Sequence, residues 1–382
     1  MKIAYVTHAR VPSAAANNVQ SVKMCSSFAS SHDVTLYSRP GDGGHVLFER
    51  FDVPRSFRAQ PLTATGPRGL RTAGWLARLR ATVGRAAPDL IYSRDLFSLC
   101  ALGDLGVPMI YEAHWSPREK PTLRTALLAL VAHRSLVRIV SISHTLQNEL
   151  RSLLPGVSAK IFIVAPSAAD GRPAATAVDL PGSGALRVGY AGQLYAGKGA
   201  ELLIPLAAHM PDVDFHVIGG DPAQVDRWSA RAPANLWFHG FRPHAEVASY
   251  LAAFDVVLAP YQESVAVSGG AEVSRWMSPL KIFEYMAMAR PMVVSDLPVL
   301  REVLDSGRTA ILVPPREVTA WAAAIDRFRD PEIRGRMGGE ARATFLRNFT
   351  WEARAVRVLA DLPSPCSRRG ALARAARSLV PA

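Results

Sequence analysis

Two segments of the chain share one plan, and this repetition constrains the fold more than any other feature. MKIAYVTHARVPSAAANNVQSVKMCSSFA, from Met1, begins as an alternating apolar strand, breaks into a loop and continues as a helix. LRVGYAGQLYAGKGAELLIPLAAHM, from Leu186, repeats the order of strand, glycine-containing loop and helix. Since 382 residues is the length of two ordinary domains, we expect one domain for each opening.

Short apolar runs then alternate with amphipathic stretches in both halves. The runs are HDVTLYS, DLIYSRD, VPMIYEAH and RIVSIS, followed by VDFHVIGG, LWFHG, VVLAPY, PMVVSD and AILVPP. Strands that alternate with helices predict parallel sheets, so we expect an α/β protein with two Rossmann-like domains facing a central cleft. Ligands of such sheets bind beyond the carboxyl ends of the strands, which directs attention to the loops that follow them.

A polar stretch rich in proline and glycine separates the halves and predicts the domain boundaries. We expect domains over residues 1–170 and 186–350, joined by a linker over 171–185. Residues 351–382 are predicted to form a helix that crosses back to the N-terminal domain, followed by a basic tail.

The net charge of +12 is concentrated in the first half, where residues 1–182 hold 21 Lys/Arg against 12 Asp/Glu. Such a field favours anionic partners, but no nucleic-acid recognition motif is present, so we expect no nucleic acid. Two basic amphipathic stretches, 66–85 and 119–138, have two readings. They form solvated helices that cover the core, or they dock on an anionic membrane surface.

Cysteine usage and hydropathy indicate the compartment. The three cysteines are far apart without metal-ligand spacing, which indicates unpaired thiols in a reducing cytosol. The N-terminus lacks the apolar run of a signal peptide, and no segment approaches the ~20 apolar residues that span a bilayer. We therefore expect a cytoplasmic protein, with peripheral attachment to the inner face of the membrane left open.

Glycine loops after two strands of the second half suggest a phosphate site. In GQLYAGKG, Gly192 ends a strand, and Lys198 stands between two glycines just before a helix. Glycines permit close backbone approach, and a helix N-terminus with an ammonium favours phosphate. Gly219, in VIGGDP, follows the next strand. Neither opening holds G-x-G-x-x-G or a Walker motif, which argues against a simple dehydrogenase or NTPase.

The stretch SPLKIFEYMAMARP, residues 278–291, predicts a helix with Ser278 as N-cap and Pro279 at its first position. Lys281 and Glu284 then share a face near an N-terminus that attracts anions. One interpretation is a solvated ion pair; the other is a site for a ligand with phosphate and hydroxyl groups. Glu284 would accept hydrogen bonds from ribose hydroxyls in the second case.

The order of motifs along roughly residues 1–360 resembles glycosyltransferase family 4, a family with the GT-B fold. The motifs are ARVPSAAANNVQSVKMCSSFA, YSRD, YEAH, SISHTL, GQLYAGKG, HVIGGDP, SPLKIFEYMAMARP, ILVPP and NFTWEARA. The resemblance implies a retaining enzyme that moves a hexosyl unit from a UDP- or GDP-sugar to a glycan or lipid-linked acceptor. It implies a role in cell-surface polysaccharide or glycoconjugate biosynthesis, an acceptor-side N-terminal domain, a nucleotide-sugar-binding C-terminal domain, and no metal or other cofactor.

The resemblance also implies residue roles. Lys198 contacts the donor diphosphate, Glu284 binds the ribose, and His114 of YEAH lies beside the reacting anomeric carbon; these three form the catalytic set. The other donor-binding positions are Gly192, Gln193, Gly219, Ser278, Pro279, Leu280 and Lys281. The acceptor-side positions are Asn17, Asn18, Arg94 and Ser143.

Two departures from the family pattern leave alternatives open. Gln193 stands where many members carry arginine, and Trp276 stands at the first position of their Glu-x7-Glu pair, which defines an SPLK-type variant. Glu272 or the backbone of Gly269-Gly270 would have to replace the missing carboxylate. The alternatives are a GT-B nucleotide-sugar epimerase and a catalytically inactive nucleotide-sugar-binding protein.

Overall fold

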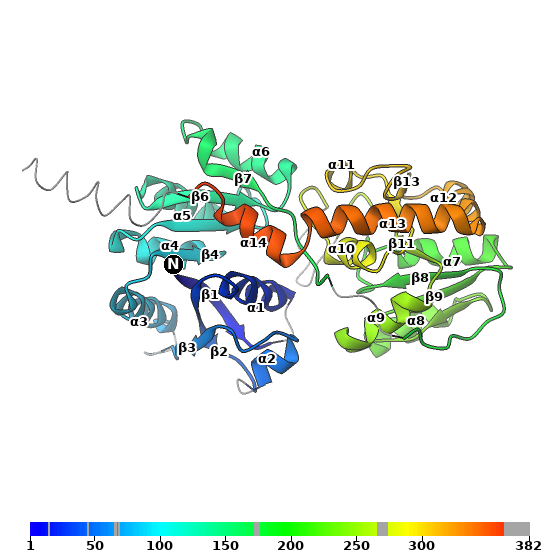
Figure 1. Cartoon of the computed structure of the whole chain (residues 1–382), viewed down its shortest axis with the longest axis horizontal. Coiled ribbons are helices and arrows are strands. Elements are labelled where there is room, and N and C mark those ends of the chain that lie inside the picture. The colour runs from blue at the N-terminus through cyan, green and yellow to red at the C-terminus, as the bar shows by residue number, and fades with distance from the viewer. Residues whose placement is uncertain are drawn as a thin grey trace, which may run out of the picture. The chain divides into compact units, whose positions relative to one another are not determined.

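The computed structural model describes residues 1–13, 16–43, 46–64, 67, 69–171, 176–265 and 274–362. They form two compact units (Figure 1). Unit 1 comprises Met1–Ile142, Leu146–Ala165 and residues 355–362, and unit 2 comprises Ser143–Thr145 and Pro166–Arg354. The predicted basic tail beyond residue 362, Glu272 and Gly269-Gly270 lie outside the described residues.

Unit 1 contains a seven-stranded parallel sheet with the order β3-β2-β1-β4-β5-β6-β7. Its strands are β1 (Lys2–Val11), β2 (Asp33–Pro40), β3 (Arg58–Pro61), β4 (Leu90–Ser93), β5 (Met109–Ala113), β6 (Leu136–Ser141) and β7 (Phe162–Val164). Strands β2 and β3 are added on one side of β1, and β4 to β7 on the other side. The switch point between β1 and β4 is the usual place for a ligand in this topology.

Helices of unit 1 connect these strands as the alternation of apolar runs predicts. They are α1 (Ala16–Ala29), α2 (Leu47–Arg50), α3 (Arg71–Ala86), α4 (Leu96–Leu102), α5 (Pro121–Ala132) and α6 (His144–Leu153), the last beginning within Ser143–Thr145 of unit 2. Helix α14 (Trp351–Leu359) also ends in unit 1. There the guanidinium of Arg138 on β6 donates to the carbonyl oxygen of Val358 at 2.6 Å.

Unit 2 contains a six-stranded parallel sheet with the order β10-β9-β8-β11-β12-β13. Its strands are β8 (Arg187–Ala191), β9 (Asp214–Ile218), β10 (Leu236–Phe238), β11 (Val256–Ala259), β12 (Met292–Ser295) and β13 (Ile311–Val313). The order again reverses between the first strand of the unit and the fourth, here β8 and β11. Both units thus have the doubly wound topology that the sequence predicts.

Both faces of the unit 2 sheet are covered by helices. These are α7 (Ala200–His209), α8 (Pro222–Ser229), α9 (His244–Ala253), α10 (Leu280–Ala287), α11 (Pro298–Arg301), α12 (Val318–Asp326) and α13 (Pro331–Asn348) (Figure 1). Successive residues of β11 alternate between two cores: Val257 packs with α10, and Leu258 packs with α7 and α12. This burial on both faces explains why the strands read as continuous apolar runs.

The apolar runs predicted to be strands are confirmed, but the two edge strands of unit 1, β3 and β7, were not predicted. Strand β3 is exposed along its length, so no apolar pattern identifies it. Helix α10 begins at Leu280 with Pro279 as its N-cap, so the predicted cap at Ser278 is wrong. The hydroxyl of Ser278 instead accepts a hydrogen bond from the backbone N–H of Ser167 at 2.8 Å, which occupies it outside the helix.

Part of the predicted linker, residues 176–185, has no regular secondary structure but packs on unit 2. Leu180 is buried in the core that contains α10, and the N–H of Val178 donates to the carbonyl oxygen of Ser249. None of the helices in the described ranges has both the length and the apolarity required to cross a bilayer.

Candidate functional sites at the two sheet switch points

The predicted donor residues of unit 2 gather where β8 and β11 end side by side. Gly192, Gln193 and Lys198 lie in the loop after β8, and the chain after β11 leads to the turn before α10. Gly219 lies in the loop after β9, the other neighbour of β8. The fold therefore brings GQLYAGKG and the turn before α10, the two segments predicted to bind phosphate, to the switch point of this sheet.

Glycine is required where the loops after β8 and β9 touch. Gly192 and Gly219 have φ angles of +150° and +120°, which side chains disfavour. A Cβ at position 219 would collide with the backbone carbonyl of Gly192. The N–H of Gly192 donates to the Ile218 carbonyl at 2.8 Å, so the two loops are joined backbone to backbone.

Two lysine side chains point at one aromatic ring in this site. The ammonium of Lys281 lies 5.0 Å from the ring centroid of Tyr261, and that of Lys198 lies 5.2 Å from the same centroid. The Lys281 ammonium also lies 3.7 Å from the ring centroid of Tyr190 on β8. Aromatic faces attract cations, but they do not neutralise them.

Lys281 is only 9% exposed, and its Nζ has no hydrogen-bond partner among the residues that the structure describes. Burial lowers the pKa of Lys281 well below its usual value, nearby Lys198 lowers it further, and Glu284 opposes both. Burial also lowers the pKa of Lys198. The interpretation of Lys281 and Glu284 as a solvated surface ion pair is therefore wrong. The arrangement is suited to an anion that enters the site.

The remaining predicted donor residues lie in the loop after β8 or at the start of α10. Gln193 has an exposed side chain, and its carbonyl oxygen accepts a hydrogen bond from the Tyr190 hydroxyl at 2.8 Å. Glu284 is half-buried on α10, one turn beyond Lys281. Pro279 and Leu280 are half-buried at the start of the same helix.

Unit 1 has a pocket of about 320 Å³ at the carboxyl ends of β1, β4 and β5. Its lining includes His8, Asn17, Arg94, Asp95, His114 and Trp115. Three predicted residues, His114, Arg94 and Asn17, are thus brought together at the switch point of the first sheet.

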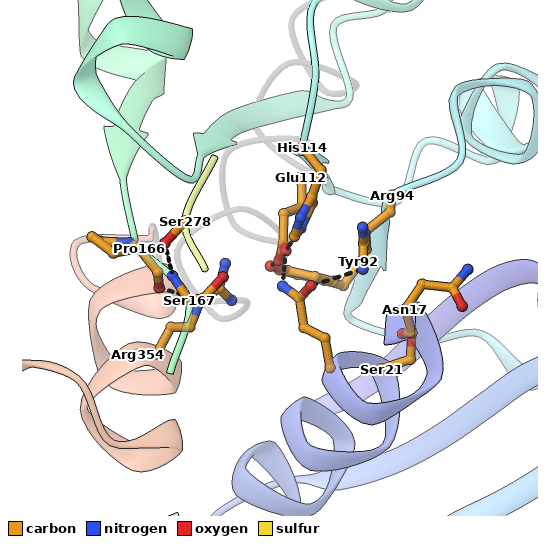
Figure 2. A network of polar contacts seen from close by, with 11 residues as sticks. Asn17, Ser21, Tyr92, Arg94, Glu112, His114, Pro166, Ser167, Ser278 and Arg354 are labelled. Atoms are coloured by element: carbon orange, nitrogen blue, oxygen red, sulfur yellow. Dashed lines mark hydrogen bonds and ion pairs between the residues drawn. The ribbon is translucent and has the colours of Figure 1, made fainter. Parts of the chain in front are cut away.

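Glu112 on β5 also lines this pocket and is the centre of a hydrogen-bond network (Figure 2). Its carboxylate is 1% exposed and accepts hydrogen bonds from the Tyr92 hydroxyl and the Gln20 amide, and it pairs with Nε2 of His114. Arg94 donates to the Gln20 amide oxygen at 2.7 Å. Since a buried carboxylate is stable only when its oxygens are paired, this network fixes the His114 ring.

Two predicted acceptor-side residues do not line the pocket. Asn18 is fully buried, and its amide donates to the carbonyl oxygens of Arg10 at 3.0 Å and Ser13 at 3.3 Å, which shapes the loop after β1. Ser143 is buried in the segment grouped with unit 2, where its hydroxyl donates to the Trp276 carbonyl at 3.2 Å.

Sequence reasoning missed Glu112, Tyr92 and Gln20 in unit 1, and Tyr190 and Tyr261 in unit 2. Glu112 had a detectable signal, because a carboxylate inside the apolar run MIYEA needs buried partners. Tyr92 on β4 and Tyr190 on β8 had none, since aromatic residues are common in strands. Among the residues described, no group of three or more His, Cys, Asp or Glu side chains is placed to hold a metal ion.

Comparison with known proteins assigns both units. Residues 21–167 match the model described as "Glycosyltransferase Family 4", and residues 185–330 match "Glycosyl transferases group 1". Together the two matches cover most of the chain. The chain belongs to glycosyltransferase family 4. The family predicted from the motifs is therefore confirmed.

Individual relatives of this family 4 chain are distant. It is 30% identical over 163 residues to an alpha-D-kanosaminyltransferase of Streptomyces kanamyceticus, covering 40% of this chain and 39% of the relative. It is 28% identical over 184 residues to a D-inositol 3-phosphate glycosyltransferase of Corynebacterium diphtheriae, covering 44% of this chain and 40% of the relative. These alignments span well under two thirds of both curated relatives.

The fold of the family 4 chain has structural counterparts over nearly its whole length. HepE of Anabaena, in complex with UDP and glucose, superposes with a TM-score of 0.67 at 17% identity, covering 95% of this chain and all of HepE. The predicted GT-B fold, with two Rossmann-like sheets, is confirmed by this likeness and by the two strand orders.

Proposed function

We propose that the chain is a retaining hexosyltransferase that uses a UDP- or GDP-sugar as donor. The observation that supports this most directly is a pair of amines directed at Tyr261: that of Lys281 is buried, and that of Lys198 is half-buried. Two amine side chains at one ring favour a ligand that carries two negative charges, and the diphosphate of a nucleotide sugar is such a ligand.

The residues of unit 2 suit departure of a nucleoside diphosphate. Lys198 and the turn of Ser278–Lys281 would stabilise the charge that develops on the leaving diphosphate, without reorganising at the moment of transfer. Glu284 would hold the ribose, as carboxylates do in other nucleotide sites. Trp276 carries no carboxylate, so we assign the site to an SPLK-type variant in which the turn itself contacts the donor.

In unit 1, we assign His114 to support of positive charge at the anomeric carbon during transfer. The pocket beside it has Trp115 and His8 for the apolar face of a sugar ring, and Arg94, Asp95 and Asn17 for its hydroxyl groups. These side chains support a glycan or the sugar head group of a lipid-linked molecule as acceptor. The names of the two curated relatives, both transferases, agree with transfer of a glycosyl unit and do not bear on the acceptor.

We also propose that the chain is cytoplasmic and associates with an anionic membrane surface through α3. Arg71, Arg78 and Arg85 are exposed and seven residues apart, so they lie along one side of a helix that contains no acidic residue. Such a location is suited to cell-surface polysaccharide or glycoconjugate synthesis. Sedimentation with vesicles of anionic lipid tests this point, and binding should weaken in salt and in the triple Arg→Gln variant.

A thermal-shift panel of UDP-, GDP- and dTDP-sugars tests the proposed donor, because a ligand that binds only the folded state raises the melting temperature. Lys198→Ala and Glu284→Ala should each abolish most of the shift, whereas Lys2→Ala, at an exposed position of unit 1, should leave it intact. If both site variants respond like the parent, the site is misplaced.

Product analysis then separates the remaining functions. Release of nucleotide with an acceptor supports transfer. Isomerisation of the donor alone would indicate an epimerase, and binding without nucleotide release under any acceptor would indicate an inactive binding protein.

A further inference from the structure

Nζ of Lys281 lies beside Gly192, next to Gln193, where many family members carry arginine. We propose that Lys281 takes up a proton from solvent when a diphosphate binds, and thereby provides the second positive charge of the site beside Lys198. This inference rests on the donor site proposed above and specifies how that site obtains its charge.

The position of Nζ places this charge at the loop after β8. Nζ of Lys281 lies 2.8 Å from the point where a Cβ at Gly192 would stand. The adjacent Gln193 offers a neutral amide, so a diphosphate at this loop would find its cation on α10 instead. The Lys281 side chain therefore extends from α10 to the loop after β8, where the neutral Gln193 provides no positive charge.

The surroundings of Nζ hold it ready for an anion. It is more than nine-tenths buried, and no hydrogen-bond partner for it occurs within the described part of the chain. The faces of Tyr190 and Tyr261 enclose it at 3.7 and 5.0 Å. An amine in such a place gains hydrogen bonds only when a ligand brings acceptor oxygens.

The ionisable groups that face Lys281 set the direction of the proton transfer. From the loop after β8, Lys198 disfavours its charge; from α10 itself, Glu284 favours it. From β8 and the chain after β11, the faces of Tyr190 and Tyr261 also favour the ammonium, while the hydroxyls of both have pKa values raised by burial and stay neutral. Burial outweighs the favourable contacts and lowers the pKa of Lys281 well below its usual value.

Binding moves one proton from solvent to Nζ. In the empty site the neutral amine has a free electron pair; on binding, that pair takes one proton from buffer, and the ammonium donates to a diphosphate oxygen. No bond of the sugar changes in this step. The proton returns to solvent when the nucleotide leaves.

Calorimetry measures this proton directly. UDP-glucose and GDP-mannose are suitable probes, since their diphosphate diesters do not titrate between about pH 7 and 8.5. Titrations in two buffers of different ionisation enthalpy give the number of protons exchanged. We expect uptake that rises with pH toward about one proton per bound probe, because more Lys281 is neutral in the free protein at higher pH.

Variants assign the proton to one side chain. Lys281→Met should abolish the uptake and weaken binding roughly 10- to 150-fold, the loss of one charged hydrogen bond. Lys2→Met, at an exposed position of unit 1, should change neither quantity.

Three outcomes would overturn the inference, and they differ in what else they affect. Binding without proton uptake in the parent protein overturns it even if Lys281→Met does not fold. Uptake that persists in a folded Lys281→Met variant also overturns it. Both results leave the proposed donor site standing if Lys198→Ala abolishes binding. If neither probe binds at all, the inference and the proposed function fail together.

Discussion

Nζ of Lys281 occupies the space that a side chain at Gly192 would need, since a Cβ at position 192 would lie 2.8 Å from it. The two residues belong to different elements, α10 and the loop after β8. Because Nζ is confined by two tyrosine rings, it has little freedom to move aside. The site therefore depends on glycine at position 192 as much as on the lysine.

Gly192→Ala should impair both stability and ligand binding. The substitution places a side chain at a φ of +150° and against Nζ, which we expect to cost about 1–3 kcal/mol of unfolding free energy. Displacement of Nζ should also reduce the thermal shift given by the preferred nucleotide sugar. Denaturant unfolding and the shift assay measure the two effects; a variant that matches the parent in both would contradict the geometry.

Two adjacent glycines of α13 should respond in opposite ways to alanine. A Cβ at Gly338 would collide with the backbone carbonyl of Ala289, which follows α10, so Gly338→Ala should destabilise the protein by about 1–3 kcal/mol. Gly339 is exposed with open space around it, so Gly339→Ala should stabilise the helix by up to about 1 kcal/mol. Urea denaturation of the pair checks this, and equal effects would mean that α13 does not pack as described.

Removal of the Glu112 charge should disturb the pocket of unit 1. Three side chains present donors to this carboxylate, and Glu112→Gln would turn an amide NH2 toward at least one of them. We expect a loss of about 1–3 kcal/mol in unfolding free energy and a larger fractional loss of transfer activity, because His114 is no longer held.

Tyr92→Phe provides the matched control for that prediction. It removes one donor and leaves the contact of Glu112 with His114, so its effect on transfer should be much smaller than that of Glu112→Gln. Equal losses of activity in the two variants would show that Glu112 does not act through His114.

Stability should fall in mild acid because of a histidine inside the unit 2 sheet. His216 is buried on β9, stacks on Trp237 and Phe254, and shares a hydrogen bond of 3.2 Å with His239. Burial, followed by His239 and Arg187, lowers the pKa of His216 from 6.5 to about 4. The neutral form is favoured by folding, so its contribution is complete above pH 6.5 and is lost as the pH falls toward 4.

Unfolding measured across that pH range should show a loss of roughly 1–3 kcal/mol that His216→Phe removes in large part. Phenylalanine keeps the stacking but cannot bind a proton. Since burial also lowers the pKa of His239, some slope should remain in the variant. An unchanged slope would contradict a buried, neutral His216.

Local patterns were sufficient for the elements and the family. The strands of both sheets are apolar because both faces are covered, and this appears in the sequence as short runs between amphipathic helices. The motifs GQLYAGKG and SPLKIFEYMA could be assigned to loops at strand ends, since chain order places them there. Strand β3 was missed because it is an exposed edge that buries no side chains.

Contacts between residues that are far apart in the sequence could not be predicted from these local patterns. Whether Lys281 is a surface cation or a buried amine depends on Tyr190 and Tyr261, which reach it only because β8 and β11 are neighbours in the sheet. Ser278 is a residue type that commonly caps helices, yet its hydroxyl accepts a hydrogen bond from the backbone N–H of Ser167 instead.

Sequence alone thus determined the alternation of strands and helices, the doubly wound sheets and the family, since these follow from periodicity and motif order within short segments. Only the tertiary structure decided which charges are buried, which polar groups are paired, and that Glu112 supports His114. The reason is physical: desolvation and hydrogen bonding depend on which side chains surround a group, and the order of strands in a sheet sets those neighbours across the whole chain.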